Sequence, residues 1–452
     1  MTFLGGGEMA HKGEADAGGS RIWVNHRGLL LVCFSVTVLG AYFPFVLAGH
    51  VPMRLFMIAS ALVCISQMPR TVGVAGMRFN FFFALTFIVF ALITTSLVRL
   101  DVAAASFAMN LERWFILSPL FFWLGLRISA SRAVRDFMHA YLAVSLVVAL
   151  LAIVEWGLNG SIFGRDDLFE YLTRSDRGRA VLGSDHPLVL GLLLAASIPT
   201  ISVLRSRWQV LVAFALLIGG VYATGSRGPL VISLVAGACL IILRHPKWRE
   251  SLSGPLKFVI IAGFLVLSYF AAFVWSSEIV GSSGYDYSSG YREALYSLLP
   301  QILTDFPFGA GFGDLPTGVY TISSDFLGLR DVSRTIDSEV VYLALQAGLF
   351  GVGIYLAAIW ISARAFRFDA TVAIFALTFG LGGLFLALHA WDSVGPIWLL
   401  AVGLSAGVAS PRRFRAIDPV RPAAGDYCDS GSKRKTHKGP TVEPQSTDEL
   451  VV

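Results

Sequence analysis

The sequence predicts an all-α integral membrane protein with about twelve transmembrane helices. Of its 452 residues, 55% are hydrophobic and 14% are charged, whereas charged residues make up about 25% of an ordinary soluble domain. The apolar residues fall in blocks of roughly 17–25 residues, the length needed to cross a bilayer. Arginine and lysine gather in alternate connections between these blocks, which is typical of a membrane bundle with a defined cytoplasmic side.

Each predicted helix is an apolar block bounded by polar or charged residues. The first six blocks are residues 28–48, 54–68, 79–98, 106–128, 137–156 and 187–204. The other six are residues 209–223, 228–243, 256–275, 340–362, 370–388 and 396–409. Several blocks are shorter than a full span, the second and the seventh among them.

Positive charge sets the predicted orientation and domain organisation. With residues 1–27 in the cytoplasm, most arginine clusters and all lysines fall on the same side of the membrane. Residues 28–409 then form one polytopic membrane domain. Residues 410–452 are polar, basic and rich in proline and glycine, so we expect a disordered cytoplasmic tail. Two long loops, about 157–186 and 276–338, face outward, and loops of that length are usually functional.

The outward face carries arginines that the topology rule would not place there. They are Arg165, Arg174, Arg177, Arg179, Arg227, Arg292, Arg330 and Arg334. The planar guanidinium binds phosphate oxygens through two parallel hydrogen bonds and never loses its charge. These arginines therefore indicate either an anion site or ion pairs with neighbouring aspartates.

Arg227 lies in a turn suited to an anion. In "YATGSRGPLV", residues 222–231, Gly225 and Gly228 permit a tight turn and Pro229 suits the first helical position. The turn aims the N-terminus of the next helix outward, and helix N-termini bind anions. The alternative is an arginine that extends to the membrane surface from a helix end.

Arg292 heads a segment with leucines at helical spacing. Residues 291–304 are predicted to form an amphipathic helix along the membrane surface. Pro307 and three glycines, at 309, 311 and 313, follow it in a bend. The bend is interpreted either as a phosphate-binding loop or as a connection that returns to the bilayer.

Two carboxylates, Asp337 and Glu339, stand where the block 340–362 begins. Aspartate is a favoured N-cap and a glutamate in the first turn suits the helix dipole, so both have a structural interpretation. Either could also contact a substrate. Glu155 is interpreted as an interfacial carboxylate, with a substrate contact as the alternative. The segment "HAWDSVGP", residues 389–396, is interpreted as a polar turn, with a place in the site as the alternative.

Taken in order, four motifs resemble the O-antigen polymerase and ligase superfamily (Wzy and O-antigen ligase type). They lie within residues 178–356 and read "GRAVLGSDHPLVLGLLL", "ATGSRGPLV", "YREALYSLLPQILTDFPFGAGFGD" and "DSEVVYLALQAGLFGVGIYL". The resemblance implies a GT-C-like membrane glycosyltransferase of the bacterial inner membrane. Its substrate would be a glycan linked to undecaprenyl pyrophosphate, and it would use no metal or other cofactor.

The resemblance also implies roles for residues and partners. Arg179, Arg227 and Arg292 would hold the pyrophosphate leaving group, and Asp337 or Glu339 would activate the acceptor hydroxyl. Besides membrane lipids, a chain-length regulator and a flippase are suggested partners, and nucleic acid is not.

One departure from the superfamily bears on the choice of activity. Its ligases place a histidine at the start of the helix where this chain has Asp337, and the outward histidines His186 and His389 lie outside that motif. The sequence therefore favours a polymerase over a ligase that attaches glycan to lipid A–core or protein. A transporter of lipid-linked glycans is a further alternative, but its ionisable residues should lie at mid-membrane depth.

Overall fold

The computed structural model describes residues 27–43, 50–68, 104–131, 133–163, 178–184, 186–244, 287–311, 318–324, 328–332, 336–391 and 393–409. All of them belong to one unit, Met1–Pro411. The predicted spans 79–98 and 256–275 and the predicted tail 410–452 lie outside the described residues.

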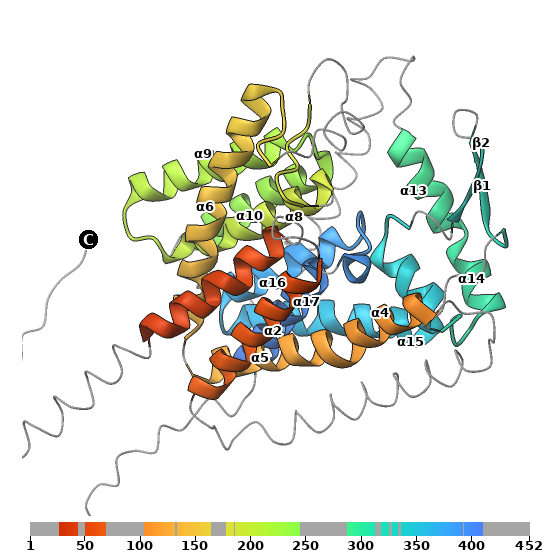
Figure 1. Ribbon diagram of the computed structural model, residues 1–452, viewed down its shortest axis with the longest axis horizontal. Helices are drawn as coiled ribbons and strands as arrows, with labels where there is room; N and C mark the ends of the chain where they lie inside the picture. The colour runs from red at the N-terminus through yellow and green to blue at the C-terminus, as the bar shows by residue number, and fades with distance from the viewer. Residues whose placement is uncertain are drawn as a thin grey trace, which may run out of the picture. The chain divides into compact units, whose positions relative to one another are not determined.

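Within the described residues, the elements are helices and one two-stranded hairpin (Figure 1). Before residue 245 they are Arg27–Tyr42, α2 (His50–Gln67), α4 (Ala104–Glu112), the π-helix η2 (Arg113–Leu117), α5 (Ser118–Ala130), α6 (Val134–Leu158), α8 (Pro187–Ser197), the 3-10 helix η3 (Ile198–Val203), α9 (Arg207–Ala223) and α10 (Arg227–Arg244). After residue 286 they are α13 (Tyr287–Ser297), α14 (Leu299–Asp305), β1 (Thr321–Ser324), β2 (Gly328–Asp331), α15 (Glu339–Arg364), η5 (Ala365–Arg367), α16 (Ala370–Gly382), η6 (Leu388–Ala390) and α17 (Val394–Val408).

The described helices differ in whether they could cross a bilayer alone. Two are long and apolar enough, Val134–Leu158 and Glu339–Arg367. The other apolar helices have 10–17 residues, and at 1.5 Å per residue they fall short of a hydrocarbon core of about 30 Å. The predicted helical architecture is confirmed over the described residues, and the number of spans stays a prediction.

Glycine allows the closest helix contact in the bundle, between α5 and α17. A Cβ atom at Gly125 would lie 2.1 Å from the carbonyl oxygen of Leu400, and one at Gly403 would lie 2.1 Å from that of Phe122. Small residues let two helix backbones approach in this way inside a membrane. Elsewhere α6 packs on α9, and α16 packs on α8, α10 and α15.

Several predicted helices are interrupted, and two of the interruptions position polar side chains. The block 106–128 divides into α4, η2 and α5, with the π-helix beginning at Arg113. The block 370–388 ends as α16 at Gly382, and the separate helix η6 carries His389. α15 is kinked at Gly348, where φ is 59°. π-Helical turns are frequent at functional sites.

The second outer loop folds onto the start of α15. The segment 291–304, predicted as one amphipathic helix, forms parts of two helices, α13 and α14. Pro300, in the first turn of α14, lies at the break between them. The prediction of an all-α protein missed the antiparallel hairpin, in which Thr321 pairs with Asp331 and Ser324 with Gly328. The apolar side chains of these elements form a cluster of their own with α15: Tyr291, Leu295, Ile302, Tyr320, Ile322, Val332, Val341, Ala344 and Leu345.

Candidate functional site

Arg179, near the end of the first outer loop, holds the turn that opens α10. Its Nε donates to the carbonyl oxygen of Thr224 at 2.8 Å, and its Nη2 donates to Ser226 Oγ at 2.9 Å. The neighbouring N–H of Ala180 donates to the carbonyl oxygen of Ala223 at 3.0 Å. The loop and the turn are therefore fixed to each other on both sides of the arginine.

Phe385, just beyond α16, connects that turn to Arg292. A Cβ atom at Gly228 would lie 3.3 Å from Cγ of Phe385, so the first turn of α10 lies on this ring. The Cζ atom of Arg292 lies 5.7 Å from the centroid of the same ring, where a cation is attracted to the aromatic face. Arg227 begins α10 and is exposed.

Arg292 has a carboxylate neighbour and an unsatisfied donor. Its Nη2 atom lies 3.8 Å from Oδ2 of Asp337, and the two side chains are 18% and 47% exposed. Its Nε is buried and has no hydrogen-bond partner among the described residues. A buried, unpaired guanidinium N–H is costly, and an anion such as phosphate would satisfy it with a charge-assisted bond.

Asp337 lies beside Arg292 and does not cap α15. The N-cap is Ser338, which makes no capping hydrogen bond with its side chain and lies 2.9 Å from the hydroxyl of Tyr296. Burial raises the pKa of the Asp337 carboxyl, and the positive charge of Arg292 acts in the opposite direction. The predicted capping role of Asp337 is therefore wrong, and its side chain is available for contacts within the site.

Glu339 is fully buried, and both of its carboxylate oxygens are hydrogen-bonded to one residue, His389. Its Oε2 accepts the backbone N–H of His389 at 3.0 Å, and its Oε1 is hydrogen-bonded to the ring Nδ1. His389 is 4% exposed and comes from η6, fifty residues further along the chain. The segment interpreted as a polar turn thus supplies a histidine to the start of α15.

Two tryptophans fix the His389 ring. Trp114, from η2, stacks on it with ring centroids 4.6 Å apart and planes at 6°. Trp398, from α17, meets it edge to face at 5.5 Å and 81°. The Nε2 atom of the ring is buried and has no hydrogen-bond partner among the described residues.

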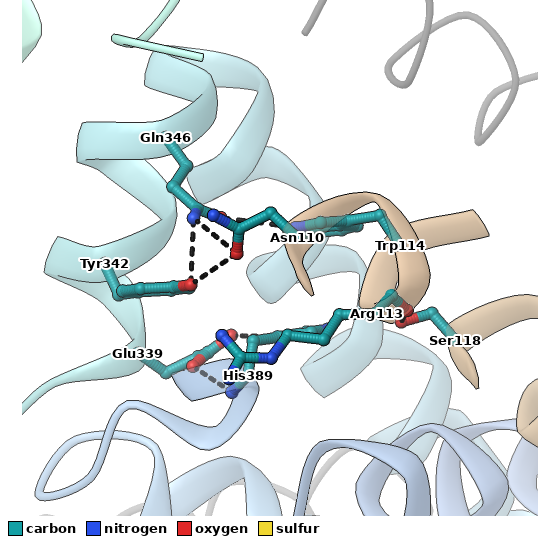
Figure 2. A network of polar contacts seen from close by, with 8 residues as sticks. All are labelled: Asn110, Arg113, Trp114, Ser118, Glu339, Tyr342, Gln346 and His389. Atoms are coloured by element: carbon teal, nitrogen blue, oxygen red, sulfur yellow. Dashed lines mark hydrogen bonds and ion pairs between the residues drawn. The ribbon is translucent and has the colours of Figure 1, made fainter. Parts of the chain in front are cut away.

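Polar side chains of α15 and η2 surround this pair (Figure 2). Gln346 Nε2 donates to Tyr342 Oη at 2.8 Å, and Trp114 Nε1 donates to Gln346 Oε1 at 3.2 Å. Arg113 extends toward Glu339 and is a charged neighbour of the Tyr342 hydroxyl. The π-helix therefore directs a cation and an aromatic ring to the same place.

The glycine-rich bend after α14 docks on the kink of α15. The N–H of Leu349 donates to the carbonyl oxygen of Pro307 at 3.0 Å. A Cβ atom at Gly309 would lie 2.2 Å from the carbonyl oxygen of Gln346, and one at Gly348 would lie 2.1 Å from that of Pro307. The structure supports the interpretation of a connection that returns to the bundle, because the backbones of the bend and the kink are in direct contact.

Glu155, in the last turn of α6, fixes the backbone that follows Arg179. Its Oε2 accepts the N–H groups of Val181 at 2.9 Å and Leu182 at 2.7 Å, and its Oε1 accepts that of Ile162 at 3.2 Å. Its side chain is fully buried, so the interpretation as an interfacial carboxylate is wrong. It orders the first outer loop from inside the protein.

The predicted site residues thus fall into two neighbouring groups. The arginines and Asp337 lie around the α10 turn and Phe385, whereas Glu339 is paired with His389. Arg113 and His389 were not predicted as site residues. The signal for Arg113 was an ionisable residue inside an apolar block, which usually marks function. Arg165, Arg174, Arg177 and Arg334 lie outside the described residues.

Over the described ranges, no three side chains of histidine, cysteine, aspartate or glutamate are placed to hold a metal ion. The expectation that the reaction uses no metal stays a prediction.

Comparison with known families gives a match that contains three of the four motifs. Residues 212–356 match the family model described as O-antigen ligase (Wzy_C). The matched segment is similar to an O-antigen ligase family domain and covers less than half of the chain. The domain contains Arg227, Arg292, Asp337 and Glu339, whereas Arg179 and His389 lie outside its matched range. No curated protein sequence matches the chain.

The family match confirms the resemblance to the O-antigen polymerase and ligase superfamily. Proteins with the O-antigen ligase domain are embedded in membranes and act on lipid-linked glycans in the manner of glycosyltransferases. The apolar helices described above are therefore those of a membrane protein. The acceptor, the reaction product and the orientation of the termini stay predictions.

Proposed function

We propose that the protein is a polymerase of undecaprenyl-pyrophosphate-linked oligosaccharide repeat units in the assembly of a bacterial O-antigen or exopolysaccharide. It would transfer the growing glycan at the periplasmic face of the inner membrane. The observation that carries the proposal is that Arg179 is hydrogen-bonded to the turn before Arg227, and that this turn and Arg292 lie against the same ring, Phe385. Asp337 and Glu339 follow immediately at the start of α15.

This grouping suits displacement of a pyrophosphate from a sugar. The acceptor hydroxyl attacks the anomeric carbon from the face opposite the leaving group, which inverts that carbon. Negative charge develops on the pyrophosphate, and fixed cations aimed at it lower the barrier. The buried Nε of Arg292 and the exposed guanidinium of Arg227 supply that charge. The proposed reaction needs no metal, because the arginines neutralise the leaving group.

Polymerase is preferred over ligase because Asp337 stands where ligases of the superfamily have a histidine. A ligase that transfers glycan to lipid A–core or protein is the second candidate. One observation favours it: His389 brings a histidine to the start of α15 from another element.

Glycan profiles of cells that lack the protein distinguish these activities. A polymerase mutant should accumulate glycans capped with a single repeat unit. Long polymer left on undecaprenyl pyrophosphate would indicate a ligase. Normal polymer length with repeat units trapped inside would indicate a transporter.

Complementation of the same cells tests the arginines. Arg292→Ala should fail to restore long glycans although the protein reaches the membrane. The matched control is Arg364→Ala, since Arg364 also lies over an aromatic ring, with its Cζ 5.4 Å from the centroid of Trp360, but stands in the last turn of α15. Equal activity of the two variants would remove Arg292 from the site.

A further inference from the structure

We infer that His389 is the catalytic base of the transfer, that its Nε2 takes the proton of the acceptor hydroxyl, and that Glu339 is the positioning carboxylate behind it. The inference rests on the proposed function and deepens it. It assigns the base to a residue outside the matched family domain, and to neither of the two carboxylates predicted from the sequence.

The geometry of the pair fixes which ring nitrogen is available. Glu339 accepts from the backbone N–H of His389 and is hydrogen-bonded to its Nδ1. A carboxylate at one ring nitrogen holds the proton there and leaves the lone pair on the other, as in carboxylate–histidine pairs of hydrolases. The lone pair of His389 is therefore on Nε2.

That Nε2 atom is placed to receive a hydrogen bond that the described residues do not supply. It is buried and unpartnered among them. Trp114 and Trp398 prevent the ring from turning to find another partner. A buried acceptor without a donor is unfavourable, and a hydroxyl of the acceptor sugar would provide one.

The charges around the imidazole suit a proton acceptor. Glu339 in α15 stabilises the imidazolium that forms when the proton arrives. Arg113 in η2 extends toward the same carboxylate, and Tyr342 and Tyr355 are further titratable neighbours of Glu339 among the described residues. The Asp337–Arg292 pair lies at the adjoining start of α15.

The transfer balances with no further reactant. As the acceptor oxygen bonds to the anomeric carbon, its proton moves to Nε2 of His389. The bond from that carbon to the pyrophosphate oxygen breaks, and its electron pair leaves with undecaprenyl pyrophosphate. The imidazolium then releases the proton to the leaving pyrophosphate or to water, which restores the base.

A histidine that only connected η6 to α15 would give a different kinetic result from a catalytic base. Purified full-length protein in nanodiscs would be given lipid-linked repeat units extracted from cells that lack the protein. His389→Gln should lower kcat at least about 100-fold, the usual contribution of a general base, and leave binding of undecaprenyl pyrophosphate within about threefold.

The matched control is His186→Gln. His186 accepts the N–H of Leu188 through Nδ1 at the start of α8, and glutamine retains a side-chain acceptor, so activity should remain normal. Glu339→Gln is the second test, because it should lower kcat and spare binding even if His389→Gln yields too little protein.

Two results would overturn the inference. One is a near-normal kcat in His389→Gln, and the other is loss of undecaprenyl pyrophosphate binding together with kcat in both variants. Failure of the wild-type protein to bind undecaprenyl pyrophosphate would instead overturn the proposed function on which the inference rests.

Discussion

At the scale of single residues, two carboxylates close together in the sequence have different surroundings. Glu339 is fully buried and both of its oxygens contact His389. Asp337 is half-exposed, and its charged neighbour Arg292 is 3.8 Å away. Because an ion pair at that separation with a half-exposed carboxylate is weak, Asp337 can exchange partners with a ligand, whereas Glu339 cannot without breaking two hydrogen bonds.

Asp337→Asn is expected to keep activity within about tenfold of wild type, since the base is His389 and general-base loss would cost at least about 100-fold. Burial raises the pKa of the Asp337 carboxyl, so protonation begins at a higher pH than for an ordinary aspartate. As the pH falls, the wild-type side chain becomes neutral and its attraction to Arg292 is lost. Asparagine is neutral at every pH, so the change in rate that accompanies protonation of Asp337 should be absent from the pH–rate profile of the variant.

The control for this variant is Asp369→Asn. Asp369 caps α16 by accepting the N–H groups of Thr371 and Val372 at 3.0 and 3.2 Å, and asparagine caps helices equally well. Its turnover should match wild type. A loss of 100-fold or more in Asp337→Asn alone would make Asp337 the base and contradict the role given to His389.

At the scale of elements, the site depends on backbone contacts between helices and loops. The bend after α14 fits the kink of α15 because neither Gly309 nor Gly348 has a side chain, and both have positive φ, 83° and 59°. Glu155 similarly ties the first outer loop to the last turn of α6. These contacts hold the loops that carry Arg179 and Arg292.

Gly348→Ala should destabilise the protein markedly. A non-glycine residue at such a positive φ costs about 1–3 kcal/mol, and the new Cβ would also lie 2.1 Å from the carbonyl oxygen of Pro307. The same substitution at Gly353, in the same helix with nothing within 4 Å, should be neutral or gain up to about 1 kcal/mol of helix propensity. Thermal unfolding in detergent compares them, and equal midpoints would show that the kink is not required.

Glu155→Gln should loosen the first outer loop. Glutamine offers only one acceptor oxygen and turns its NH2 group toward the other backbone donors. At least one buried N–H group, of Val181, Leu182 or Ile162, therefore loses its acceptor. Such a loss costs about 1–3 kcal/mol of stability. Undecaprenyl pyrophosphate binding should weaken about tenfold, because the displaced backbone adjoins Arg179. Glu293→Gln, at an exposed position of α13, is the control, and identical affinities would rule out a role for Glu155 in ordering the loop.

At the scale of the whole molecule, the sequence predicted the helices better than the site. Helix-length apolar blocks were sufficient to locate α6, α9, α10 and α15, and short motifs identified Arg179, Arg227 and Arg292. The breaks were not predicted, because a π-turn at Arg113 and the end of α16 at Gly382 arise from packing that no local pattern reveals. His389 was undervalued for the same reason: its partner Glu339 is distant in sequence.

The orientation of the whole protein is the remaining prediction. If Arg205 and Arg207 keep the start of α9 in the cytoplasm, the elements around Arg292 face the periplasm. Trp208, 76% exposed, precedes the apolar part of α9, and Glu293 is exposed in α13. Cysteine at 293 should therefore react with a membrane-impermeant maleimide in spheroplasts, and cysteine at 208 only after lysis.

Cys33, Cys64 and Cys239 are buried and should stay unlabelled, and Cys428→Ser removes the cysteine of the predicted tail. Each labelling variant, Glu293→Cys or Trp208→Cys, must first complement the glycan defect, so that labelling reports the functional protein. The opposite labelling pattern would place Arg227, Arg292 and His389 in the cytoplasm. A polymerase of periplasmic glycans could not work from there, because its acceptor and donor would lie across the membrane from the arginines.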